Sequence, residues 1–141
     1  MSFGENCELN WFVGYTGINQ EPLARRGLKD LNLEVYLPMG SKMVRHARKE
    51  EVRVFPIFSR YLFIKFEPTP ESLASIRSTD GIIDILTNNW IPMSVPDVII
   101  DGIRELEGSG FFDVKPQFHV KQKKWSRGFS ILKAILEPTR A

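Results

Sequence analysis

The chain has 141 residues and a net charge of +2, from 19 Lys and Arg against 17 Asp and Glu side chains. Hydrophobic residues make up 43% and charged residues 26%, which excludes wholesale disorder. The positive and negative charges are too balanced to indicate a nucleic-acid-binding protein by themselves. A single cysteine excludes an internal disulfide framework and a cysteine-based zinc site. Because the apolar runs are short and no signal-peptide pattern is present, we expect a cytoplasmic protein without membrane contact.

Charge is divided unevenly along the chain. Residues 42–60 carry six basic and two acidic side chains, residues 61–114 three basic and nine acidic, and residues 115–141 seven basic and one acidic. Basic segments bind phosphates or acidic protein surfaces, but a solvated hairpin and a soluble tail show the same pattern. Both interpretations stay open for the two basic segments.

Strands are predicted where β-branched and aromatic residues run between turn signals. These runs lie at residues 11–16, 33–38, 59–66, 82–86 and, in a shorter form, 91–95. Residues 43–55 predict a charged β-hairpin whose tip lies among the polar residues 46–51.

Three helices are predicted between these strands. Asn19 is the expected N-cap of the first, with Pro22 in its first turn. Residues 72–78 and 96–108 predict the second and third helices. The expected apolar stripe of the first helix is Leu23, Leu28 and Leu31. The order of elements predicts an α+β domain, with an antiparallel four-stranded sheet flanked by helices and a projecting basic β-hairpin.

Three segments stand at a spacing typical of one known family. They are WFVGYT at residues 11–16 followed by NQE at 19–21, LEVYLP at 33–38 before a basic stretch, and FSRYLFI at 58–64. With them, about residues 10–107 resemble the N-terminal domain of the NusG transcription elongation factors, especially the RfaH-like specialised paralogues. In most relatives a proline stands at the position of Ser59, so this turn is altered here.

The resemblance implies that the chain binds RNA polymerase on its clamp helices and gate loop, and suppresses pausing or termination. Aromatic residues on a central strand are also typical of a protein core, and that alternative stays open. The positions implied for clamp-helix contact are Tyr15, Phe58, Arg60, Tyr61 and Phe63. The gate-loop positions are Ser72, Leu73 and Ala74, where RfaH-like relatives carry His-Thr-Thr and only Ser72 keeps a polar side chain.

RfaH-like relatives also contact the exposed non-template DNA strand through basic residues of the first helix. Arg25, Arg26 and Lys29 stand at these positions, and Arg26 and Lys29 share a helix face because they are three residues apart. Contacts to phosphates would be salt-dependent and tolerant of sequence. Asp80 stands where RfaH-like relatives have a basic residue, which disfavours recognition of DNA bases. The alternative for the three basic residues is a solvated helix face without DNA contact.

The resemblance changes near the C-terminus. Residues 108–110, Gly-Ser-Gly, predict a joint, so the expected domains are residues 1–107, a linker at 108–117 and a segment at 118–141. This last segment resembles an incomplete KOW domain, a short remnant of a β-barrel, and we expect no stable barrel. The incompleteness disfavours contact with the ribosomal protein or termination factor that KOW domains bind. An alternative is a helix at residues 121–136 that masks the clamp-binding surface.

Nothing in the sequence indicates an enzyme. His46 and His119 have no Cys, Ser or carboxylate partner at an informative spacing, and no phosphate-binding glycine motif is present. We therefore expect no catalytic residue, no cofactor and no metal, and a monomeric protein. Two other hypotheses remain: a stand-alone single-stranded nucleic-acid-binding module, and a degenerate NusG paralogue that competes for polymerase.

Overall fold

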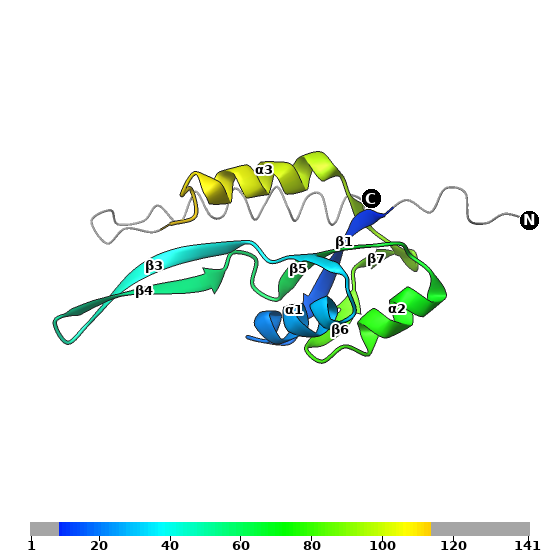
Figure 1. Cartoon of the computed structure of the whole chain (residues 1–141), viewed down its shortest axis with the longest axis horizontal. Helices are drawn as coiled ribbons and strands as arrows, with labels where there is room; N and C mark the ends of the chain where they lie inside the picture. The colour runs from blue at the N-terminus through cyan, green and yellow to red at the C-terminus, as the bar shows by residue number, and fades with distance from the viewer. Residues whose placement is uncertain (1–8, 114–141) are drawn as a thin grey trace, which may run out of the picture. The chain divides into compact units, whose positions relative to one another are not determined.

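The computed structural model describes residues 9–113 (Figure 1). These residues form two compact units. Among the described residues, the first unit comprises residues 9–37 together with Ser59–Ile100, and the second comprises Pro38–Phe58 together with residues 101–113. The predicted KOW-like segment at 118–141 and the alternative masking helix at 121–136 lie outside the described residues.

An antiparallel sheet forms the centre of the first unit (Figure 1). The predicted α+β architecture is confirmed, but the sheet has five strands instead of four. The extra strand is present because β6 pairs only with the end of β1, which leaves Trp11 and Phe12 to pair with β9. The strand order is β2-β5-β1-β6, with β9 on β1. The strands are β1 (Asn10–Thr16), β2 (Glu34–Tyr36), β5 (Tyr61–Phe66), β6 (Ile82–Ile85) and β9 (Ser94–Val95).

One face of this sheet carries large apolar side chains that are fully buried. The rings of Phe12 and Phe66 lie 4.7 Å apart, and Leu62 and Ile64 have no exposed surface. Gly14 lies on the same face, where an added Cβ would stand 2.9 Å from Cδ1 of Ile64. A glycine at this position therefore allows the neighbouring side chains to pack tightly over β1.

Helix α1 (Glu21–Asp30) begins after Gln20, not after the predicted cap Asn19. Asn19 has a φ of 60°, in the left-handed region, and no side chain caps the helix. The predicted stripe is also only partly correct, because Leu23 and Leu31 are exposed. The buried face, at helical spacing, is Glu21, Ala24 and Leu28.

Helix α2 (Pro70–Arg77) begins two residues before the predicted start. Its first turn is fixed by a capping box, in which the Ser72 N–H donates to the Thr69 hydroxyl and the Thr69 N–H donates to the Ser72 hydroxyl. Ile76 is buried, and Leu73 is half-buried.

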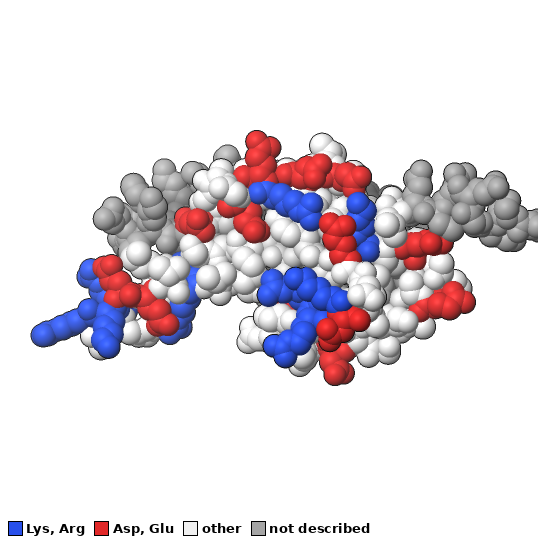
Figure 2. All heavy atoms as spheres, in the orientation of Figure 1, with Lys and Arg blue, Asp and Glu red and all other residues white. Residues whose placement is uncertain are grey.

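The second unit contains the predicted basic hairpin, formed by β3 (Met39–His46) and β4 (Lys49–Pro56). A two-residue turn joins them at Ala47 and Arg48, and Figure 2 shows Lys and Arg side chains gathered at this end of the hairpin. The base of the hairpin is tied to the end of helix α3 (Asp97–Gly108) because the Met39 N–H donates to a Glu107 carboxylate oxygen, at 3.0 Å.

A smaller hairpin, β7 (Thr87–Asn88) and β8 (Ile91–Pro92), follows β6 in the first unit. Its strands have two residues each, and a two-residue turn joins them. None of the helices in residues 9–113 is long and apolar enough to cross a membrane.

Candidate functional site

Two of the predicted site residues meet on the face of the sheet opposite Gly14. Tyr15 on β1 pairs with Tyr61 on β5 in the sheet register, and their ring centroids lie 5.4 Å apart at 48°. Both side chains are half-buried, so part of each ring reaches solvent. Paired rings of this kind offer apolar area with a polar hydroxyl at the edge.

Arg60 lies over the first of these rings. Its guanidinium carbon is 4.5 Å from the Tyr15 ring centroid, within cation–π range. Its Nε donates a hydrogen bond to the Thr16 carbonyl at 3.1 Å, which fixes the direction of the side chain. The backbone of Arg60 has a φ of 72°, in the left-handed region that disfavours residues other than glycine. The surrounding contacts must therefore hold this conformation.

A buried carboxylate supplies one of these contacts. Glu21, at the start of α1, is 3% exposed, and its Oε1 accepts a hydrogen bond of 2.8 Å from the Arg60 N–H. The Thr16 N–H also donates to the Arg60 carbonyl at 2.8 Å. The sequence indicates for Glu21 only a place near the start of a helix, because a contact between residues 39 positions apart leaves no periodic signal.

Phe63 and Phe58 differ from these residues because they do not reach solvent. Phe63 is 1% exposed and stacks on Tyr36 of β2, with ring centroids 6.1 Å apart. It is buried at the centre of a strand that has β1 and β2 on its two sides. Phe58 is 4% exposed and belongs to the second unit. The accessible part of the predicted patch in the first unit is therefore Tyr15, Arg60 and Tyr61, called the tyrosine surface below.

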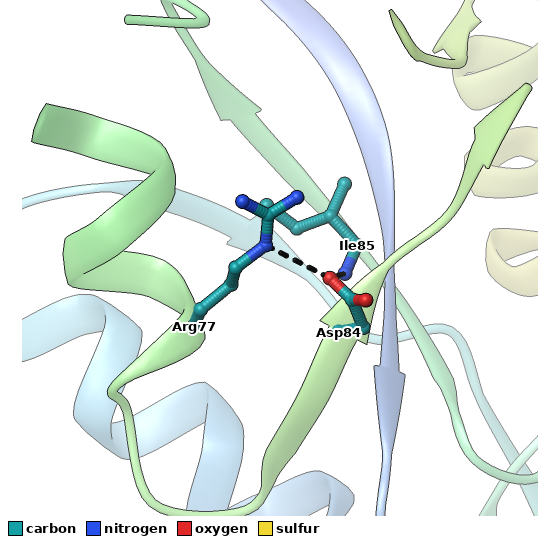
Figure 3. Close-up of polar contacts among 3 residues, drawn as sticks. All are labelled: Arg77, Asp84 and Ile85. Atoms are coloured by element: carbon teal, nitrogen blue, oxygen red, sulfur yellow. Dashed lines mark hydrogen bonds and ion pairs between the residues drawn. The ribbon is translucent and has the colours of Figure 1, made fainter. Parts of the chain in front are cut away.

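An ion pair that the sequence analysis missed borders the tyrosine surface. Asp84 on β6 is the register partner of Tyr15, so the two side chains lie on the same face of the sheet. Figure 3 shows Asp84 between two donors: Nε of Arg77, at 2.9 Å, and the Ile85 N–H, at 2.7 Å. The register between β1 and β6 brings Asp84 beside Tyr15, and the sequence does not show this register.

The environment of Asp84 lowers the pKa of its carboxyl group below the ordinary 3.8. Partial burial raises the pKa, but the hydrogen bonds from Arg77 and the Ile85 N–H and the charge of Arg77 outweigh it. A lowered pKa stabilises the folded chain above the unfolded-state pKa, and this contribution is lost as the pH falls through the lower folded-state value.

We expect Asp84→Asn to reduce the free energy of unfolding by less than about 1 kcal/mol at pH 6, because the ion pair is exposed. Below pH 3.8 the difference from the natural chain should shrink as Asp84 becomes protonated. Urea unfolding of the two chains at pH 6 and at a pH below 3.8 measures the difference in stability. A difference that is the same at the two pH values would contradict the assignment.

The predicted gate-loop positions lie in the first turns of α2. The Ser72 hydroxyl donates to the Glu67 carbonyl and takes part in the capping box, so the fold already uses it. Leu73 is half-buried and Ala74 is exposed. Of the three side chains, only that of Ala74 is freely presented, and it is apolar.

The predicted DNA-contact residues lie on α1. Arg26 and Lys29 are exposed and Arg25 is half-buried. Arg26 borders an open hollow of ≈ 440 Å³. Asp30 and Asp80 also line this hollow, so it carries both positive and negative charges. The other lining residues are Leu23, Gly27, Leu31, Ser75, Ser78 and Thr79.

Comparison with known proteins gives a family match over the whole of this site. Residues 9–104 match the family described as "Transcription termination factor nusG". The chain belongs to the NusG family. The match covers residues 9–104, and the description of the family names a transcription termination factor.

The NusG fold is also found among solved structures. The chain is similar to a structure described as "Domain interaction in Thermotoga maritima NusG", with 15% sequence identity and a TM-score of 0.55. The match covers 72% of this chain and 59% of the Thermotoga chain, so this chain spans less than two thirds of that protein. A comparison with curated proteins gives no match.

Proposed function

We propose that this chain binds the clamp helices of RNA polymerase through the tyrosine surface and suppresses pausing or termination. The observation that supports this is the arrangement of Tyr15, Arg60 and Tyr61: two half-exposed rings in contact, with a cation held over one of them. Tyrosine and arginine are enriched among the residues that dominate binding at protein interfaces.

The rigidity of the surface supports the same proposal. Arg60 is fixed by the Glu21 carboxylate and by two hydrogen bonds with Thr16, so little side-chain freedom is lost when a partner binds. The Arg77–Asp84 pair supplies a polar border beside the rings. An amphipathic helical hairpin with acidic residues fits this surface, with its apolar side on the rings and a carboxylate near Arg60.

The proposal also includes contacts between helix α1 and DNA. Arg26 and Lys29, with Arg25, are available for phosphates of the non-template strand, although Asp30 and Asp80 reduce the positive field beside Arg26. The use of Ser72 in the helix cap argues against a polar gate-loop contact of the RfaH type. The proposal also includes a monomeric, non-enzymatic protein that acts in the cytoplasm, with RNA polymerase as its partner.

A transcription assay tests the proposed function. Stalled elongation complexes are restarted in a single round, and the half-life of a defined pause is measured with and without the purified chain. We expect a shorter pause with the natural chain and no effect from the Tyr15→Ala/Tyr61→Ala variant at the same concentration. An unchanged or longer pause with the natural chain would count against the proposal. Tight binding of free single-stranded oligonucleotides would instead support the stand-alone nucleic-acid-binding hypothesis.

A further inference from the structure

Trp90 is the most exposed of the large hydrophobic side chains in residues 9–113, with 94% of its surface accessible. It lies in the turn between β7 and β8, next to Ile91, which is 69% exposed. A ring in this position contributes almost no buried apolar area to folding. The tip formed by Trp90 and Ile91, called the Trp90 tip below, is therefore not explained by the core of the unit.

The backbone of the turn makes tryptophan an unfavourable residue here. Asn89 has a φ of 51° and Trp90 a φ of 70°, so both turn residues are left-handed. Two-residue hairpin turns with this geometry favour Asn at the first position and Gly at the second. Asn89 follows this preference, whereas Trp90 breaks it with a bulky side chain. A disfavoured residue that is also exposed points to a role outside folding.

The Trp90 tip stands on a fixed base. The Met93 N–H donates to the Leu86 carbonyl at 3.0 Å, and the Leu86 N–H donates to the Val13 carbonyl of β1 at 2.9 Å. These bonds connect the small hairpin to strand β1 of the sheet. The ring is thereby presented at a defined place, which lowers the entropic cost of binding.

The charge pattern indicates which kind of partner fits. Residues 85–96 contain no charged side chain, and Asp84 and Asp97 flank them. Nucleic acids are bound mainly through cations that neutralise phosphates, and this hairpin supplies none. A neutral tip of Trp90 and Ile91 fits instead an apolar pocket on a protein, where a tryptophan is a frequent anchor.

We propose that the Trp90 tip is a second docking point, which inserts into an apolar pocket on a protein subunit of RNA polymerase. The choice of polymerase as the partner rests on the proposed function. The tip and the tyrosine surface would then act together, with the tip supplying an apolar anchor that is independent of the cation at Arg60.

Trp90→Asn tests the anchor, because asparagine accepts the left-handed backbone and removes the ring. We expect binding to purified core RNA polymerase, measured by biolayer interferometry, to weaken about tenfold or more. Trp90→Phe should restore part of the affinity. Val98→Ala is the matched control, since Val98 is 72% exposed in the same unit, and it should bind like the natural chain.

The same titration identifies the source of any loss. For a protein pocket, the ratio between the natural chain and Trp90→Asn stays the same with and without a DNA–RNA scaffold, and at low and high salt. A loss that appears only with the scaffold would indicate stacking on a base and overturn the proposal. Equal affinity of the two chains would overturn it as well. So would a dimer in sedimentation velocity that only the natural chain forms, because the partner would then be a second copy.

The two proposals fail in different ways. If Trp90→Asn binds normally while Tyr15→Ala/Tyr61→Ala does not, the Trp90 tip is wrong and the tyrosine surface stands. If the tyrosine variant binds normally while Trp90→Asn does not, the tyrosine surface is wrong and the tip stands. If the natural chain does not bind polymerase, the proposed function and this choice of partner are both rejected.

Discussion

Tyr15→Ala/Tyr61→Ala is expected to weaken binding to RNA polymerase elongation complexes about 30-fold or more, the effect of removing a central interface anchor. The two rings contact each other, and the Arg60 guanidinium lies over the Tyr15 ring, so their joint removal takes away most of the tyrosine surface. The measurement is the equilibrium dissociation constant on immobilised elongation complexes, with urea unfolding of each variant alongside.

The control for this variant is Tyr15→Phe/Tyr61→Phe. It keeps both rings and removes only the hydroxyl groups, so we expect affinity within about threefold of the natural chain. A natively stable alanine variant that keeps full affinity would show that polymerase is bound elsewhere. Equal losses in the alanine and phenylalanine variants would assign the binding to the hydroxyl groups.

Phe63→Ala is expected to lower the free energy of unfolding by about 3–5 kcal/mol, as for other large side chains truncated in a core. Phe63 is 1% exposed and stacks on Tyr36, so its removal leaves a cavity in the sheet. Urea unfolding followed by far-UV circular dichroism measures the loss. We expect Phe63→Ala to change stability and not the affinity for polymerase, because the buried ring is not accessible to a partner.

Phe63→Leu separates support from contact at the same position. It should cost about 1–2 kcal/mol and keep polymerase affinity at a temperature where the chain is folded. If Phe63→Ala were as stable as the natural chain and yet lost binding, Phe63 would be a contact residue that becomes exposed in the complex.

The regular elements were predictable because their signals are local. The run of aromatic and β-branched residues at 59–66 gave the central strand Tyr61–Phe66, and the polar tip between apolar residues gave the basic hairpin. The start of α1 was predicted wrongly, since Asn19 has the side chain of a cap but a left-handed backbone. Residue type alone does not distinguish a helix cap from a left-handed turn, because Asn is favourable in both.

The site was predictable only in part, because exposure depends on neighbours in the sheet. Tyr15, Tyr61 and Phe63 have similar side chains and lie on the same face of two neighbouring strands, yet only the two tyrosines reach solvent. The contact between Glu21 and Arg60 joins a helix start to a distant turn, and the pair of Arg77 and Asp84 depends on strand register. Contacts of these kinds follow from the assembled fold.

The most direct test of the tyrosine surface is a photo-crosslink from its centre. A photoreactive phenylalanine derivative replaces Tyr61, and the elongation complex with this chain is irradiated and analysed by mass spectrometry. The same derivative at the exposed position Val98 serves as the reference. We predict a crosslink from position 61 to the clamp helices, and none to them from position 98. A crosslink to the clamp helices from position 98 alone, with position 61 unreacted, would contradict the account.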